Sequence, residues 1–247
     1  AGLARGALVR FGRRGAPRRQ ATFEGYGRTR RAFSGPDALG LNEALPDQVT
    51  SWLETTPATQ RPAFVSVGIG AEPLPGFEET TRVLVDSLRP LLEGGVGVSL
   101  RTRRNVPDDV MSLLADHAPN VRVSVPLPLL EAPALQTWEP GTGSPTQRLF
   151  TVQRLRAARI PVTLMLKPLI PFVNDDRGHL ERLVGAVADT GVKQVSAAFL
   201  RMRPVVRKRL DAQAQATSRP EIPWHAFSEE ESEPWQHFQY AIVEIRR

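Results

Sequence analysis

A glycine-rich segment follows the first strongly apolar stretch of the chain and has the composition of a ligand-binding turn. The stretch 63–67 reads Ala-Phe-Val-Ser-Val, and Gly68, Gly70, Glu72 and Pro73 come after it. Glycines at the end of a strand let backbone groups approach a ligand closely, and a carboxylate such as that of Glu72 accepts hydrogen bonds from a ligand amine. A plain turn between a strand and a helix has the same composition. The glycine spacing does not match the dinucleotide-binding fingerprint.

Three arginines stand at the end of the next apolar stretch, 96–100, where guanidinium groups could hold a carboxylate or a phosphate. They are Arg101, Arg103 and Arg104. A guanidinium binds such anions through a fork of N–H donors, although solvation of one or two of these side chains at the surface is the competing interpretation. Further polar candidates fall within or after later strands: Ser124, Lys167 and Asn174.

The composition excludes several classes of site. The chain has no cysteine, so its own residues offer no disulfide, zinc thiolate site or cysteine-held iron–sulfur cluster. Its four histidines are dispersed, without metal-ligand spacing: His117, His179, His225 and His237. We therefore predict no metal ligands and assign no catalytic residue. No apolar run reaches the length of a membrane span, and we expect a cytoplasmic protein.

The chain carries a net charge of +6, and its first 23 residues contain arginines but no acid. Arg13, Arg14, Arg18 and Arg19 form the densest part of this segment and are the predicted nucleic-acid contacts, since arginines bind phosphates. Two other interpretations stay open. Only three of the 32 basic residues are lysines, so the enrichment in arginine partly reflects residue usage. Organelle transit peptides are also rich in arginine and poor in acids.

Short β-branched stretches alternate regularly with helical patterns, as in βα units that build a parallel sheet. We predict strands at 63–67, 96–100, 121–125, 161–166 and 194–199. Apolar residues at helical spacing predict helices around 83–92, 110–114, 149–155 and 180–187. The fold class is therefore α/β, either an open doubly wound sheet or a barrel, and both place ligand sites at the carboxyl ends of the strands.

Taken in order, several segments resemble the radical S-adenosylmethionine (SAM) superfamily, and most closely its spore-photoproduct-lyase-like branch. The matching segments are 68–73, similar to the glycine-glycine-glutamate-proline motif; 98–103, with Arg103 where the branch commonly has lysine; 138–149, similar to "EPG, small-Pro, ERL"; 159–175, similar to "GIPV…PIIPGLND"; and 199–203, similar to the end of the sixth strand. The segment 138–149 is the most specific match.

This resemblance implies a partial parallel β/α barrel with a SAM site. The residues that it places at the cofactor are Gly68, Gly70, Glu72, Pro73, Arg103, Ser124, Asn174 and Arg201. We expect a basic N-terminal segment over 1–45, the partial barrel over 46–210, and a linker and C-terminal tail over 211–247. The strand-like stretch 238–245 is expected to pair at a sheet edge, closing the gap that a missing first strand would leave.

The defining motif of the superfamily, a CxxxCxxC loop after the first strand, is absent from this chain. Its position would fall near residue 1, where Ala4 and Ala7 have the spacing of the last two cysteines. Either the N-terminal end has been lost or remodelled, or alanines replaced the cysteines. A [4Fe–4S] cluster is therefore not expected from this sequence.

The absence of the cluster motif leaves two possible functions. The first is a cluster-less pseudoenzyme that acts as a binding or scaffold protein, with SAM or another nucleoside, nucleic acid or a protein as its partner and no membrane contact. The alternative is a lyase-like radical SAM enzyme acting on nucleic acid or a peptide, whose cluster cysteines are missing from this chain, replaced, or supplied by a partner.

Overall fold

The computed structural model describes residues 9–11, 22–23, 26–27, 40–69, 72–170, 173–200 and 241–244. The chain divides into two compact units, and each is described by itself. Unit 1 comprises Ala1–Ser124 and Arg154–Val162, and unit 2 comprises Val125–Gln153 and Thr163–Arg247. The sequence-based division at residues 45 and 210 stays a prediction.

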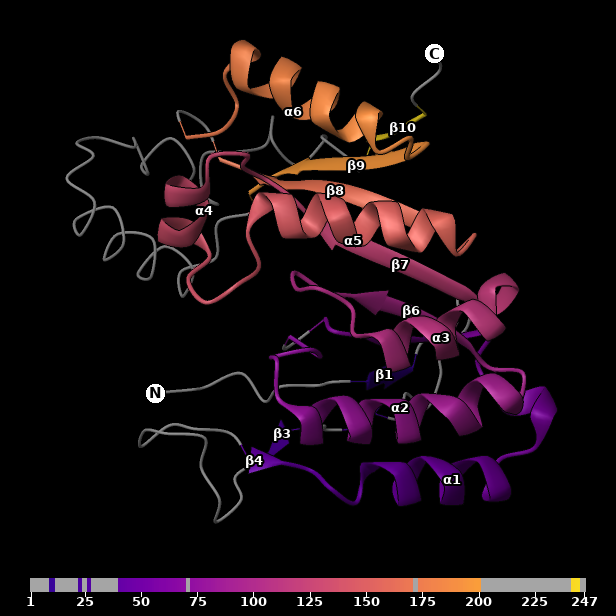
Figure 1. Ribbon diagram of the computed structural model, residues 1–247. Coiled ribbons are helices and arrows are strands. Elements are labelled where there is room, and N and C mark those ends of the chain that lie inside the picture. Colours follow the sequence, from indigo (N-terminus) through magenta and orange to yellow (C-terminus); the bar gives the residue numbers. More distant parts are fainter. Residues whose placement is uncertain are drawn as a thin grey trace, which may run out of the picture. The chain divides into compact units, whose positions relative to one another are not determined.

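Unit 1 is built on three parallel strands (Figure 1). These are β5 (Phe64–Val67), β6 (Gly97–Arg101) and β7 (Val121–Pro126), whose last two residues belong to unit 2. β1 (Val9–Phe11) pairs antiparallel with β5, and β2 (Thr22–Phe23) pairs with β1. A separate two-stranded pair consists of β3 (Tyr26–Gly27) and β4 (Gly40–Leu41).

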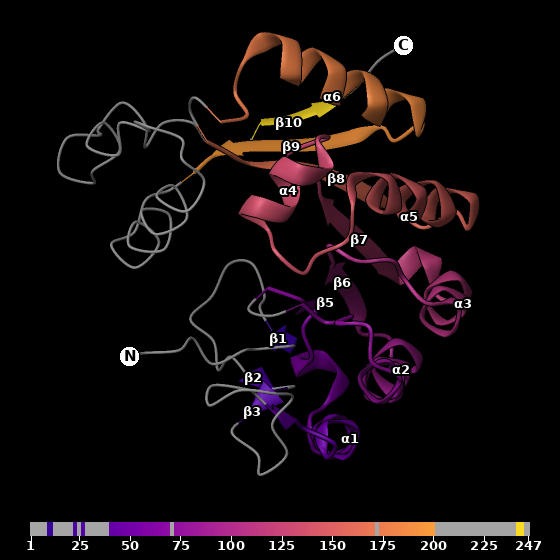
Figure 2. The ribbon, with the colours of Figure 1, turned by 60° about the vertical axis from the view of Figure 1, so that its left-hand side comes forward.

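Three helices of unit 1 lie on one side of these strands (Figure 2). They are α1 (Leu45–Thr55), α2 (Glu78–Glu93) and α3 (Asp108–Asp116), and two short 3-10 turns occupy 58–60 and 118–120. α2 buries Leu84 and Leu88 on its apolar face, as its helical spacing predicts. It ends at Gly94, as expected from the glycine pair at this position.

The two faces of the unit 1 strands differ in chemistry. Val65, Val98 and Val123 are fully or almost fully buried, whereas Ser66 and Ser99, which alternate with them and pair across β5 and β6, are half-buried. Successive strand residues point to opposite faces. One face is therefore an apolar core, and the other carries polar side chains.

Unit 2 contains most of β8 (Val162–Leu169), which runs parallel to β9 (Gln194–Phe199). β10 (Ala241–Glu244) pairs antiparallel with β9. Its helices are α4 (Ala132–Trp138), most of α5 (Pro145–Ala157) and α6 (Arg177–Asp189). The N–H of Leu127, directly after β7, donates to the carbonyl of Met165 on β8 at 2.8 Å.

The five predicted strands and four predicted helices are confirmed, with ends shifted by a few residues. α1 and α4 were not predicted. The expected C-terminal edge strand is present as β10, but it lies beside β9, whereas the free edge of β5 is covered by β1. The expectation that the C-terminal strand would close the gap of a missing first strand is therefore wrong.

Candidate functional site

The candidate site of unit 1 begins at the turn after β5, where Gly68 has a positive φ of 81°. A Cβ atom added at Gly68 would lie 2.0 Å from the carbonyl oxygen of Arg101 and 3.0 Å from Cδ of Pro73. No side chain fits at this distance. The absence of a Cβ therefore lets the end of β5 contact the end of β6.

The carboxylate of Glu72 ties the loop after β5 to the loop after β6. Oε1 accepts hydrogen bonds from the Thr102 hydroxyl at 2.5 Å and from the Leu74 N–H at 3.3 Å, and Oε2 accepts from the Arg103 N–H at 2.9 Å. Thr102 is fully buried. We call Glu72, Thr102 and the Arg103 backbone the Glu72 clamp, because together they hold the two loops in one arrangement.

The clamp continues to β7. The Thr102 N–H donates to the Ser124 carbonyl at 3.2 Å, and the Arg104 N–H donates to the Thr102 hydroxyl oxygen at 3.0 Å. Thr102 thus connects the strand ends of β5, β6 and β7. A hydroxyl can donate to one group and accept from another, which is how Thr102 serves both Glu72 and Arg104.

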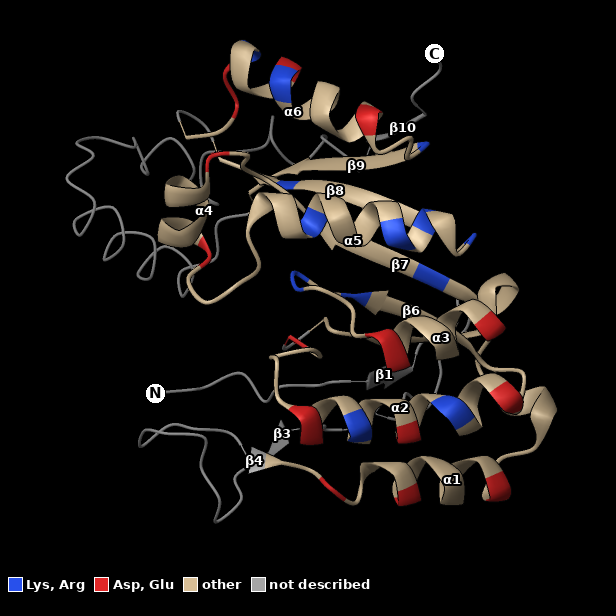
Figure 3. Ribbon diagram, viewed as in Figure 1, with Lys and Arg blue, Asp and Glu red and all other residues tan. Residues whose placement is uncertain are grey.

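Half-buried guanidinium groups stand beside this network. Arg103 and Arg104 are both partly accessible, and Nη1 of Arg104 lies 3.5 Å from the Cβ position of Gly76. Basic residues gather at the end of β6 and in the loop that follows it (Figure 3). Such a strand end can hold a carboxylate or a phosphate.

The predicted cofactor residues of unit 1 therefore lie in one network. Glu72 and Arg103 are joined by a hydrogen bond, Gly68 lies close to Pro73 and to the Arg101 carbonyl, and Ser124 joins through its backbone carbonyl. Asn174 is in unit 2. Other predicted site residues lie outside the described residues: Gly70, Arg201, Arg13, Arg14, Arg18 and Arg19. The binding roles assigned to all of these residues stay predictions.

The side chain of Asn174 is almost completely enclosed, with 1% of its surface exposed. Its Oδ1 accepts from the Ile170 N–H at 2.5 Å, and its Nδ2 donates to the carbonyls of Pro128 at 3.0 Å and Pro168 at 3.1 Å. The amide of Asn174 therefore joins the chain after β7 to the chain after β8.

The most specific sequence match, 138–149, contains a buried ion pair. The Arg148 side chain is fully buried, and its Nη1 lies 2.7 Å from Oε2 of Glu139 and 2.8 Å from the Pro126 carbonyl oxygen. Its Nε and Nη2 donate to the Gly143 carbonyl at 2.9 Å and to the Thr142 hydroxyl at 2.6 Å. This motif fixes the segment between α4 and α5 against the end of β7.

Sequence reasoning did not predict the roles of Thr102, Glu131 and His179. The His179 ring, in the first turn of α6, lies 3.2 Å from the Pro128 carbonyl oxygen and 3.3 Å from Oε2 of Glu131. Arg182 donates to Oε1 of Glu131 at 3.1 Å. Slight burial acts to raise the pKa of Glu131, but its backbone hydrogen bond, Arg182 and His179 together hold that pKa below its usual value.

The sequence offered one signal for the role of Thr102: it is the one uncharged polar residue among Arg101–Arg104, directly after a predicted strand.

Within the described part of the chain, no three His, Asp or Glu side chains are grouped as ligands for a metal ion. The described helices are all too short or too polar to cross a membrane.

No family model matches the chain. Uncharacterized proteins of Mycobacterium tuberculosis and Mycobacterium bovis are each 28% identical to it over 145 residues, which is 58% of this chain and 43% of theirs. The chain thus spans less than half the length of the curated relatives that it matches.

Among solved structures, a mutant of spore photoproduct lyase matches with a TM-score of 0.58 and 14% identity, over 80% of this chain and 62% of that one. The chain has the radical SAM fold. Spore photoproduct lyase complexed with dinucleoside spore photoproduct matches with a TM-score of 0.55 and 14% identity, over 76% of this chain and 55% of that one. Streptococcus suis SuiB bound to S-adenosylmethionine matches with a TM-score of 0.50 and 10% identity, over 75% of this chain and 43% of that one.

These likenesses confirm the predicted fold class, a partial parallel β/α barrel of the radical SAM type. The fold family uses a [4Fe–4S] cluster held by cysteine thiolates. The 247 residues contain no cysteine, so the residues present do not fit that group.

Proposed function

We propose that this chain is a cluster-less protein of the radical SAM fold that binds S-adenosylmethionine or a related nucleoside and acts as a binding or scaffold protein. The observation that supports this proposal most directly is the Glu72 clamp. Three hydrogen bonds to one carboxylate hold the loops after β5 and β6 together in a chain that has no thiolates.

The groups at these strand ends fit the amino-acid end of SAM. The half-buried guanidinium of Arg103 suits the carboxylate of that end. The Glu72 carboxylate is already engaged by donors of its own chain. We therefore assign Glu72 the role of positioning the two loops rather than that of a direct ligand contact.

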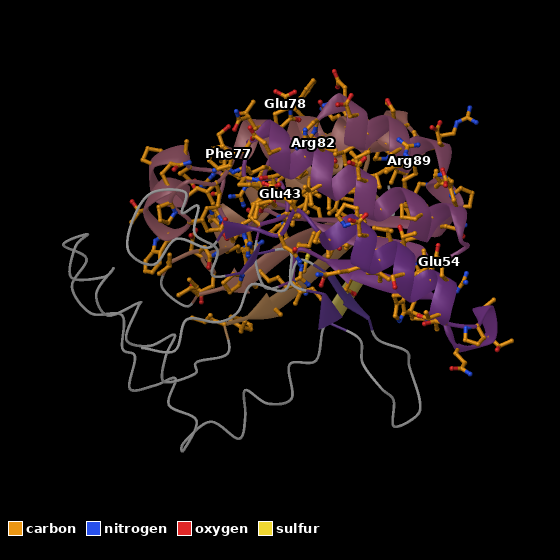
Figure 4. All side chains as sticks on the ribbon, turned by 90° about the horizontal axis from the view of Figure 1, so that it is seen from below. Glu43, Glu54, Phe77, Glu78, Arg82 and Arg89 are labelled. Atoms are coloured by element: carbon orange, nitrogen blue, oxygen red, sulfur yellow. The ribbon has the colours of Figure 1, made fainter. Side chains whose placement is uncertain are left out.

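Isothermal titration of SAM tests the proposal. We expect the unmodified protein to bind SAM and Glu72→Ala to bind at least about tenfold more weakly, a loss of about 1.4 kcal/mol, because Thr102 and Arg103 lose their acceptor and the loops separate. Glu78→Ala is the matched control, since Glu78 is exposed in the first turn of α2 (Figure 4). No binding by the unmodified protein, or equal loss in both variants, would contradict the proposal.

Radical chemistry is the second candidate function, with the cluster cysteines supplied from outside these 247 residues. It is favoured by the coverage of the curated relatives, of which the chain spans 43%. Anaerobic reconstitution with iron and sulfide, carried out before the titration on the chain together with the segment or partner that supplies the cysteines, separates the two candidates. The visible absorption of an iron–sulfur cluster would support the enzyme, and SAM binding without that absorption would support the binding protein.

Nucleic-acid contact through the N-terminal arginines is a further part of the proposal. It is supported by the charge of the segment and by the lyase structure complexed with a dinucleoside photoproduct. Each phosphate contact to single-stranded DNA contributes about 0.7 to the slope of log affinity against log salt. Neutralising Arg13, Arg14, Arg18 and Arg19 to glutamine should therefore reduce this slope by up to about 3 in an anisotropy titration of a thymidine oligonucleotide.

The matched control for these variants is the pair Arg82→Gln and Arg89→Gln, since both arginines are exposed on α2 (Figure 4). We expect this pair to leave the salt slope unchanged. A change in the slope with the control pair about half as large as that with the four N-terminal substitutions would show that net charge alone governs the affinity, since the pair removes two charges and the set removes four.

A further inference from the structure

An arginine and a phenylalanine stack on each other at the amino ends of the unit 1 strands. The guanidinium carbon of Arg122, the second residue of β7, lies 4.4 Å from the centroid of the ring of Phe64, the first residue of β5. The register pairs Arg122 with Ser99, so Arg122 projects from the polar face of the sheet. Since β5 has four residues, the stacked pair stands roughly 13 Å from the turn at Gly68, away from the loops that the SAM proposal uses.

Gly97, the first residue of β6, makes room for the Phe64 ring. A Cβ atom added at Gly97 would lie 2.5 Å from Cε1 and 2.6 Å from Cδ1 of that ring. Phe64 is paired with Gly97, so its ring can lie across β6 and present its face to Arg122 on β7. A guanidinium over an aromatic face is attracted by the negative charge of the ring face. The packing of three neighbouring strands therefore holds this cation in place.

The guanidinium of Arg122 has donors left for a ligand. Arg122 is exposed, whereas the other residues of β7 are buried or half-buried. Among the residues that the structure describes, no hydrogen bond or ion pair engages this guanidinium, and none engages the hydroxyl of Ser99 opposite it. The ring covers one face of the guanidinium. The N–H groups at its edge stay available, and they form a fork of donors that matches a phosphate.

The arginine-rich part of the chain is connected to this same end of the sheet. β1 runs antiparallel to β5 and ends at Phe11, opposite Val65, and β2 begins at Thr22, opposite Arg10. The chain therefore leaves β1 and enters β2 at the amino end of β5. The residues between these two strands, 12–21, contain the four arginines that we predicted as nucleic-acid contacts.

We propose that Arg122, stacked on Phe64, binds a phosphate of single-stranded nucleic acid at the amino ends of the unit 1 strands. This inference rests on the nucleic-acid contact proposed above and gives it a second surface, at the opposite end of the strands from the loops assigned to SAM. The Ser99 hydroxyl, paired with Arg122 in the register, can donate to the same phosphate. The outer face of the guanidinium can stack on a base, and such stacking tolerates any base.

An anisotropy titration of a labelled thymidine oligonucleotide at several salt concentrations tests the inference on the full chain. We expect Arg122→Gln to lower the slope of log affinity against log salt by about 0.7, the value of one phosphate contact, and to weaken binding at least about threefold. Arg122→Lys keeps the charge without the planar fork, so it should keep the slope but bind more weakly than arginine. Arg89→Gln is the matched control, since it removes one exposed charge from α2 and should change neither quantity (Figure 4).

The outcomes separate this inference from the contact proposed for the N-terminal arginines. Binding that depends on those four arginines but not on Arg122 would overturn the inference alone, and the reverse dependence would overturn the N-terminal contact alone. No binding by the unmodified protein would overturn both. Full affinity in Arg122→Lys, or equal losses in Arg122→Gln and Arg89→Gln, would overturn the stacked site. Displacement of the oligonucleotide by inorganic phosphate at constant ionic strength would assign the site to free phosphate and overturn nucleic acid as its partner.

Discussion

Replacing Arg148 with methionine should lower the free energy of unfolding by about 3–5 kcal/mol. The guanidinium is fully buried and lies 2.7 Å from the Glu139 carboxylate. Methionine leaves that carboxylate without its ion-pair partner in a place where only 14% of it is exposed. It also removes the donors to Pro126, Thr142 and Gly143. Urea unfolding followed by circular dichroism measures the loss.

The matched control for this variant is Arg156→Met on the same helix, because Arg156 is exposed. Surface substitutions usually change stability by less than about 0.5 kcal/mol. The double variant Glu139→Leu with Arg148→Met should recover part of the loss, since no buried charge then remains uncompensated. Equal stability of the Arg148 and Arg156 variants would show that the buried pair contributes nothing to the fold.

The buried pair also shows what a sequence match can and cannot reveal. The segment 138–149 was predicted as the most specific mark of the superfamily, with no role for either charge. The ion pair joins residues nine positions apart, and its partner carbonyl at Pro126 lies 22 positions before Arg148. Sequence patterns report local spacing, whereas this contact depends on how α5 packs against the end of β7.

The strands and the main helices were predictable because their apolar residues repeat at the spacing of the element. α1 was missed although Leu45, Val49 and Leu53 recur every four residues and are buried. We predicted no helix before the strand at 63–67, and the predicted boundary at residue 45 puts only the first residue of α1 in the N-terminal segment. A three-residue strand such as β1 has no periodic signal, because its pairing with β5 joins residues more than 50 positions apart.

The sequence predicted which types of residue form the site, but not which groups these residues contact. Glu72 was predicted as an acceptor for a ligand amine, and its acceptors are used by the Thr102 hydroxyl and the Arg103 N–H, about 30 positions away on the next strand end. A carboxylate in a turn looks the same in sequence whether its donor is a ligand or its own chain. The distances show that this one accepts from its own chain, and its predicted contact with a ligand amine stays a prediction.

Replacing Gly68 with alanine should lower the free energy of unfolding by about 3 kcal/mol and abolish SAM binding. The added Cβ would lie 2.0 Å from the Arg101 carbonyl oxygen, which is backbone and cannot rotate away. The positive φ of 81° adds about 1–2 kcal/mol for any residue with a Cβ. Relief of the clash separates the ends of β5 and β6 and so breaks the Glu72 clamp.

The matched control is Gly95→Ala, because Gly95 has nearly the same φ, 77°, and nothing within 4 Å of its Cβ position. The Gly95→Ala variant should lose only the cost of a positive φ, about 1–2 kcal/mol of the free energy of unfolding, and keep SAM binding. The difference between the two variants in urea unfolding therefore measures the contact of β5 with β6 alone. Equal losses in both variants, with SAM binding retained in both, would mean that this close approach holds neither the fold nor the site.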